Sequence, residues 1–281
     1  MPTSAPEPPP RHGRSIRSGP LGWVLLGAAL ASAILVAVWW FLVRSDPVEP
    51  PSIDAAVEAL TPTPGGGAAA TTGPDPVVPT PGDIGSTLTA DEGAPVAIDG
   101  AWTVDTTIGD PAAGTGSFVG YRVDEELAGI GANTAVGRTH AVSGSLVVEG
   151  TTITEVTVEA DLTQLHSDRP SRDRQLRTVG LETDLHPTAA FVLTRPVDLL
   201  EVPAAGTTVT VAAHGELSLH GVTRTVALDI QAQQVGDVIA VVATTPVVLA
   251  DHGIARPTGG LVLSIADRGQ LEVQLFFRKQ P

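Results

Sequence analysis

The chain of 281 residues contains no cysteine, and aromatic residues make up only 4% of it. The absence of cysteine excludes disulfides, thiolate metal sites, a cysteine nucleophile and cysteine-linked lipid anchors. Because aromatic side chains are so few, the core of any folded domain has to be mainly aliphatic. Positive charge is scarce as well, since the formal net charge is −15. This balance argues against nucleic acid as a partner, because phosphate binding needs a basic face.

The sequence also lacks the common catalytic motifs, with no GxSxG, no HExxH and no P-loop. His214, Glu216 and His220 alternate along one predicted strand, but the two histidines would lie roughly 20 Å apart, too far to share an ion. Asp251 and His252 have no identifiable nucleophile, so a hydrolase built on this pair is only a third alternative. The other histidines considered have no ligand spacing: His140, His166 and His186. We therefore predict a protein that is not an enzyme and has no metal site or cofactor.

A long uncharged run, residues 21–43 (LGWVLLGAALASAILVAVWWFLV), follows a basic tail at residues 1–20. As a helix it would be roughly 34 Å long, enough to cross a bilayer core of about 30 Å. Basic residues precede the run and acidic residues follow it, so we predict a cytoplasmic N-terminus and an extracytoplasmic remainder. A signal peptide cleaved after ASA (31–33) is the alternative, but cleavage there would leave the apolar residues 34–43 exposed. We predict an uncleaved, single-pass anchor in the cell membrane.

Residues 44–96 are rich in proline, glycine, alanine and threonine and show no apolar periodicity. This composition is typical of a disordered linker. We expect the linker to hold a folded domain, residues 97–281, away from the membrane.

Residues 97–281 alternate between apolar and polar side chains with a period of two. In TTVTVAAHGELSLH (207–220), for example, the apolar residues from Val209 to Leu219 share one face. Such alternation is typical of antiparallel strands that are buried on one face only. The other candidate strands are 101–105, 116–124, 141–149, 154–162, 189–195, 222–232, 238–249, 260–266 and 270–277. About ten strands in one domain predict an all-β fold, either a closed barrel or a sandwich.

One segment departs from this period. Residues 171–179 (SRDRQLRTV) favour a short helix with Ser171 as its N-cap and Leu176 facing inward. Two interpretations of its arginines remain open. Arg172 and Arg177 could clamp an anion such as a lipid diphosphate. Alternatively, they belong to a solvated face tied into the surrounding loop, because nearby acidic residues almost cancel their charge.

Several segments, in this order, resemble the YceI-like family, and the resemblance spans essentially all of residues 97–280. The segments are SFVGYRV (117–123), VGRTHAVSGSLVV (136–148), RDRQLRTVGLETDLHPTAAFVLT (172–194), HGELSLHGVTRTVALDI (214–230) and ADHGIARPTGGLVLSIADRGQLEVQLFFRK (250–279). The resemblance implies an extended, lipocalin-like barrel of about eight antiparallel strands with no enzymatic step. It also implies a polyisoprenoid chain in an apolar tunnel, such as an isoprenoid quinone or another polyprenyl lipid.

The alternation of side chains along each strand and the family pattern together predict which residues line this lumen. Parity selects Val119, Tyr121 and Val123, and the family pattern adds Leu176, Leu181, Phe191, Leu217 and Leu219. The resemblance places Arg172, Asp173 and Arg177 in a helical plug element, where they brace the loop or, as a second hypothesis, contact a lipid headgroup. Gln175 stands where the family usually has histidine, and Leu181 where it often has an aromatic residue.

Two functions therefore stand as alternatives. The leading prediction is a membrane-anchored, extracytoplasmic protein that binds or stores a polyisoprenoid-type lipid. The alternative is a non-enzymatic structural or interaction ectodomain whose barrel is filled by its own side chains. The expected partners are the lipid and the membrane, with a homodimer left open.

Overall fold

A computed structural model of the chain describes residues 48–60 and 98–280. The predicted cytoplasmic tail (1–20) and membrane helix (21–43) lie outside these residues and stay predictions. Within the described ranges, no helix is both long enough and apolar enough to span a membrane.

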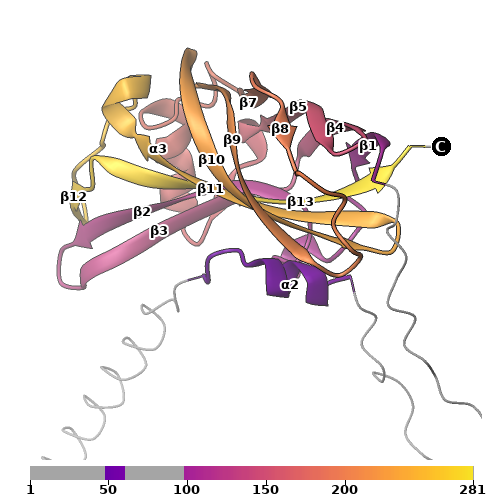
Figure 1. Cartoon of the computed structure of the whole chain (residues 1–281). Helices are drawn as coiled ribbons and strands as arrows, with labels where there is room; N and C mark the ends of the chain where they lie inside the picture. Colours follow the sequence, from indigo (N-terminus) through magenta and orange to yellow (C-terminus); the bar gives the residue numbers. More distant parts are fainter. Residues whose placement is uncertain (1–47, 61–97, 281) are drawn as a thin grey trace, which may run out of the picture. The chain divides into compact units, whose positions relative to one another are not determined.

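Eight antiparallel strands close into a barrel (Figure 1). In order around the barrel they are β1 (Gly100–Val104), β4 (Val142–Glu149), β5 (Thr152–Asp161), β7 (Thr188–Leu193), β9 (Thr208–Leu219), β10 (Val222–Val235), β11 (Val238–Val248) and β13 (Arg268–Lys279). The last strand pairs with the first, with Trp102 opposite Lys279. This pairing confirms the predicted all-β barrel and decides against the sandwich. Closure gives each of the eight strands a neighbour on both sides and so removes exposed edges.

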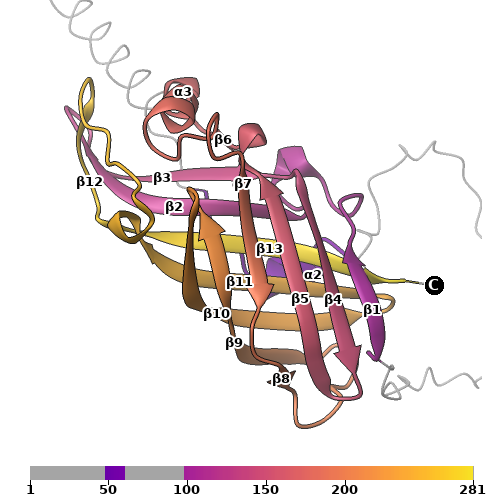
Figure 2. The ribbon, with the colours of Figure 1, turned by 90° about the horizontal axis from the view of Figure 1, so that it is seen from above.

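A second set of strands extends the sheet beside β13 (Figure 2). Only the end of β13 pairs with β1, whereas its residues 270–274 pair with β2. The strands of this set are β2 (Phe118–Leu127), β3 (Gly131–Thr139), β6 (His166–Ser167) and β12 (Val262–Ile265), whereas the short strand β8 (Val197–Asp198) pairs with β5. β3 is missing from the strands predicted above. Its sequence, GANTAVGRT, has one large apolar side chain, Val136, and so lacks the alternation that marks the other strands.

Short helices complete the domain. They are α3 (Pro170–Thr178) and the 3-10 turns η1 (Pro111–Ala113), η2 (Leu162–Gln164) and η3 (Leu249–His252). α3 confirms the predicted helical excursion, but its N-cap is Arg169 rather than Ser171, and no side chain caps it. Pro170 occupies the first turn, where a residue without an N–H group leaves no hydrogen bond unmade.

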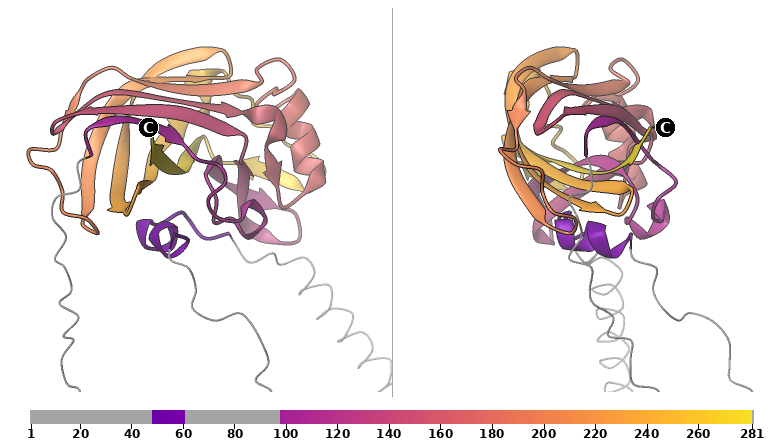
Figure 3. Two further views of the ribbon diagram at one scale, coloured as in Figure 1. Left: turned by 90° about the vertical axis from the view of Figure 1, so that its right-hand side faces the viewer. Right: turned by 45° about the vertical axis from the view of Figure 1, so that its right-hand side comes forward.

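The prediction of a disordered linker over residues 44–96 is wrong for residues 48–60. Within them, helix α2 (Ile53–Glu58) begins at Ser52, whose hydroxyl accepts a hydrogen bond from the Ala55 N–H at 3.3 Å. Ile53 and Ala56 are buried against outward-facing side chains of β11 and Phe276 of β13, and the helix lies on the outside of the barrel wall (Figure 3). β11 is consequently apolar on both faces, because its alternate residues face α2 and the barrel interior. The rest of the predicted linker, residues 61–96, lies outside the described residues.

The residues just before α2 are attached by a buried charge cluster. Glu272 on β13 is 1% exposed, and its Oε1 accepts a hydrogen bond from Arg122 Nε at 2.7 Å. Arg138 Nη2 lies 3.6 Å from the other carboxylate oxygen. Each arginine also donates to a backbone carbonyl of the segment: Arg122 to Val48 at 2.6 Å and Arg138 to Glu49 at 2.9 Å. Polar and apolar contacts together therefore hold residues 48–60 on the barrel.

Candidate functional site

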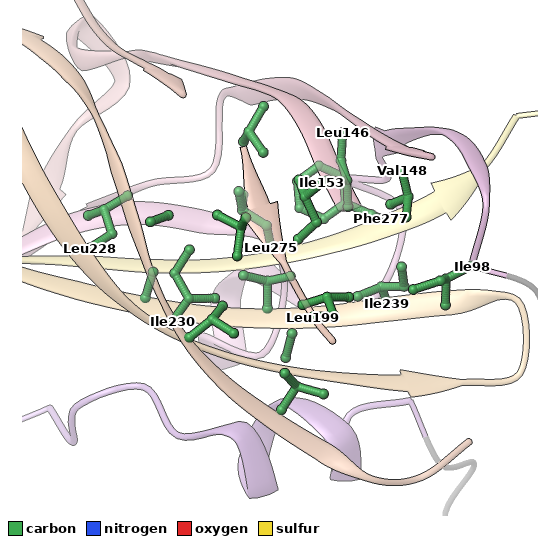
Figure 4. A pocket seen from close by; sticks show the side chains of 18 of the residues that line it. Ile98, Leu146, Val148, Ile153, Leu199, Leu228, Ile230, Ile239, Leu275 and Phe277 are labelled. Atoms are coloured by element: carbon green, nitrogen blue, oxygen red, sulfur yellow. The ribbon is translucent and has the colours of Figure 1, made fainter. Parts of the chain in front are cut away.

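The interior of the barrel holds a first cavity of about 130 Å³. It is lined by inward-facing side chains of β4, β5, β7, β9, β10, β11 and β13, and those drawn in Figure 4 consist of carbon only. Among those labelled in Figure 4 are Leu146, Ile153, Leu228, Ile230, Leu275 and Phe277. None of these was nominated as a lumen residue from the sequence. The strand alternation that identifies the apolar face could have found them, since they occupy its buried positions.

A second cavity of about 140 Å³ lies at the end of the barrel that α3 covers. Six of the eight residues nominated from the sequence line it: Val119, Tyr121, Val123, Leu176, Leu181 and Leu219. It is also lined by charged side chains, among them Glu125 and Arg172, whereas no charged residue lines the first cavity. The second cavity therefore has an apolar wall and a polar side near α3.

The remaining two nominated residues, Phe191 and Leu217, lie opposite each other on β7 and β9. Phe191 lines the first cavity, whereas Leu217 is buried and lines neither. The Phe191 ring lies against Gly215, where an added Cβ would be 2.3 Å from the ring Cζ. Ala189, two residues before Phe191, already lines the second cavity. Along β7, the boundary between the cavities thus falls between Ala189 and Phe191.

The two cavities follow each other along one face of β13. Leu271 lines the second cavity, and Val273, Leu275 and Phe277 line the first. These alternate residues cover roughly 20 Å of strand, at about 3.3 Å per residue. Each cavity is smaller than the roughly 300 Å³ at which sites for small molecules begin. A ligand that fills both would have to be long and narrow, with Phe191 beside its middle.

Tyr121 supplies an unpaired donor in the second cavity. Its hydroxyl is buried and has no hydrogen-bond partner among the described residues. Burial is the largest cause of a raised pKa of Tyr121, so the phenol keeps its proton. A buried donor without an acceptor is unfavourable unless something else supplies the acceptor. The hydroxyl is therefore available to the polar end of a ligand.

Two of the three charged residues proposed for the arginine-rich helix α3 hold it against β2 and the segment just before the helix. Arg172 Nη2 lies 2.5 Å from Glu125 Oε1 on β2, and its other terminal nitrogen contacts Asp168. Asp173 accepts hydrogen bonds from the Ser167 N–H at 2.9 Å and from its hydroxyl at 2.6 Å. The Arg177 side chain is exposed and forms no ion pair with any described residue. Arg172 and Asp173 thus brace the helix, whereas Arg177 faces solvent.

The polar residues that the sequence suggested as a metal site or a catalytic pair differ in their exposure. His214 and Glu216 are exposed on the outer face of β9. His252 is buried, with Nδ1 3.3 Å from the Leu219 carbonyl oxygen, while Asp251 is exposed. Within the described residues, no hydrogen bond joins either side chain of this pair to a serine or threonine hydroxyl. The structure instead brings Glu182 and His186 to His220, a group that the sequence reading did not assemble.

A closed antiparallel barrel with apolar cavities in its interior belongs to the class of β-barrels that can enclose a small apolar ligand. Within this class, the chain belongs to the YceI-like family, because the model of the YceI-like domain matches residues 102–277. No curated protein matches the chain.

Several solved structures are similar to this chain. One is described as a polyisoprenoid binding domain from Saccharophagus degradans implicated in plant cell wall breakdown. It has 20% sequence identity to this chain and a TM-score of 0.49, and the match covers 64% of this chain and 98% of that chain. BcnA of Burkholderia cenocepacia has 17% identity and a TM-score of 0.46, covering 59% and 98%. The YceI protein of Campylobacter jejuni has 14% identity and a TM-score of 0.43, covering 52% and 85%.

Proposed function

We propose that the barrel binds a polyisoprenoid-type lipid, such as an isoprenoid quinone or a polyprenyl lipid, and does not transform it. The observation that carries the proposal is the pair of apolar cavities in line along β13. A narrow hydrocarbon chain suits this shape, and burial alone stabilises it. At roughly 25 cal/mol per Å², a chain that buries on the order of 200 Å² gains about 5 kcal/mol.

The second cavity sets the direction of the bound chain. Tyr121, whose hydroxyl is unpaired, and Arg172 both line it, whereas no charged residue lines the first cavity. A carbonyl, hydroxyl or phosphate oxygen at the α3 end would accept the hydrogen bond that Tyr121 can donate. The proposed orientation therefore places the headgroup at the α3 end and the tail in the first cavity.

Native mass spectrometry of the full-length chain in detergent, followed by solvent extraction, tests this proposal. We expect an added mass that extracts as a polyisoprenoid. In the variant Ala232→Phe, a large ring would fill the first cavity, which Ala232 lines, and the lipid should be lost. Ala227→Phe is the matched control, because Ala227 is exposed on the same strand. A lipid-free mass, with no uptake of added quinones or polyprenols, would instead support a filled-barrel interaction domain.

We also propose that residues 21–43 anchor the protein in the cell membrane, with residues 1–20 cytoplasmic and the barrel extracytoplasmic. The apolar length and flanking charges support this proposal.

Two measurements test the anchor. Deletion of residues 1–43 should move the protein from the membrane to the soluble fraction. Protease added outside intact cells stripped of their outer layers should digest the full-length barrel. Retention of the truncated protein in the membrane, or protection from the protease, would contradict the proposal.

A further inference from the structure

Three potential metal ligands meet beside the second cavity. Glu182 and His186 lie in the loop after α3, and His220 ends the β9–β10 hairpin. Their ligand atoms all lie within 4.8 Å of one another, and each residue is half-buried. Leu181 and Leu219, the neighbours of Glu182 and His220, line the second cavity. The group is therefore part of the barrel end and not of an isolated surface loop.

A neutral His220 ring does not account for the short contact between His220 and Glu182. Its Nδ1 lies 2.9 Å from the backbone carbonyl oxygen of His252, which can only accept, so Nδ1 carries a proton. The Nε2 of a neutral ring is then a lone pair, yet it faces Glu182 Oε2 at 2.9 Å. Two acceptors this close need a proton or a cation between them.

His186 favours the cation over the second proton. Its ring centroid is 4.5 Å from that of His220, at an interplanar angle of 58°. In the described part of the chain, neither ring nitrogen of His186 has a hydrogen-bond partner. A proton on His220 would satisfy Glu182 alone, whereas a metal ion would use all three side chains.

The backbone at this point also departs from ordinary conformations. Glu182 and His220 have φ angles of +46° and +53°, and they are two of the three described non-glycine residues with positive φ. Such conformations are unfavourable for residues with a Cβ and tend to cluster at ligand sites. Gly221 lets the His186 ring approach, because a Cβ there would be 2.9 Å from His186 Cε1.

We propose that Glu182, His186 and His220 bind one divalent metal ion of the zinc class. Two imidazoles and a carboxylate are a known zinc ligand set that leaves a fourth position open for water or another oxygen. The Nδ1 hydrogen bond to the His252 carbonyl holds the His220 ring in the tautomer that a metal requires. The site does not depend on lipid binding, and the proposal differs from the expectation of no metal drawn from the sequence.

The test is a titration of the full-length chain, purified without a histidine tag and stripped with EDTA, with zinc chloride. We expect one zinc per chain by calorimetry and by elemental mass spectrometry. His186→Ala and Glu182→Gln should each weaken binding at least about tenfold, since even the loss of a partner outside the ligand set costs roughly 10–100-fold. His214→Ala, on the exposed face of β9, should bind like the wild type. Magnesium chloride should give no binding, because magnesium prefers oxygen ligands.

Failure to retain zinc, or equal retention by the wild type and Glu182→Gln, would overturn the proposal. Circular dichroism checks that each variant folds. If His186→Ala does not fold, the near-isosteric Glu182→Gln decides the outcome. As a second readout, excess zinc should raise the Tm of the wild type and of His214→Ala but not that of Glu182→Gln.

Discussion

Replacing Phe191 by alanine would remove a large side chain that lies where the two cavities meet. Phe191 is 7% exposed and its ring lies against Gly215. Truncation of a buried phenylalanine typically costs about 3–5 kcal/mol in the free energy of unfolding. We expect a value near 3 kcal/mol for the lipid-free protein, because one side of the ring faces the first cavity and has few contacts to lose. Urea unfolding of the wild type and the variant measures this difference.

The same substitution should change which lipids bind. With the ring removed, the cavities of about 130 and 140 Å³ become one continuous space. We expect Phe191→Ala to accept longer or branched chains than the wild type does, measured by native mass spectrometry with polyprenols of graded length. Phe191→Leu should give an intermediate result. Val192→Ala is the control, because Val192 is 47% exposed on the outer face of the same strand.

Two results would refute this reasoning about Phe191. A loss of stability below about 1 kcal/mol would mean that the ring contributes little to the core. An unchanged preference for chain length, in a variant that still folds, would mean that the limit to ligand length lies elsewhere in the barrel.

Three further predictions concern single polar side chains. Tyr121→Phe should leave the unfolding free energy of the lipid-free protein unchanged or higher, since the hydroxyl is unpaired. In a direct titration, the same variant should bind lipids with oxygen-containing headgroups severalfold more weakly than the wild type. Glu272→Gln should lower the free energy of unfolding, measured in urea, by about 3–5 kcal/mol, because Arg122 and Arg138 are left without a buried counter-charge. A change below about 0.5 kcal/mol would contradict the ion-pair argument. Hydrogen bonds from the Thr107 hydroxyl and then from Arg278 lower the pKa of Asp105 from its ordinary 3.8. This stabilisation is present above pH 3.8 and lost as the pH falls through the lower, folded-state pKa, so the wild-type advantage over Asp105→Asn in urea unfolding should shrink below about pH 4.

Much of the barrel could be predicted because strand alternation is a local property. The odd-numbered residues of β13 from Leu271 to Phe277 occur as an apolar set in the sequence, and the structure places them along the barrel interior. Where local alternation is weak, as in β3, prediction fails. Helix α2 was missed for a different reason, since its six residues are stabilised by packing on β11 and not by their own periodicity. The continuous apolar run VIAVVA in β11 was a signal that both faces of that strand are covered.

The sequence by itself thus determined which side of each strand is apolar, because a period of two depends only on neighbouring residues. Tertiary structure alone decided that β13 meets β1 to close the barrel, and that the interior contains two cavities that meet near Phe191. It also decided that His220 meets Glu182, which lies 38 positions away along the chain. Such contacts depend on how distant strands pair and where the loop after α3 folds back, and no local pattern in the sequence records that.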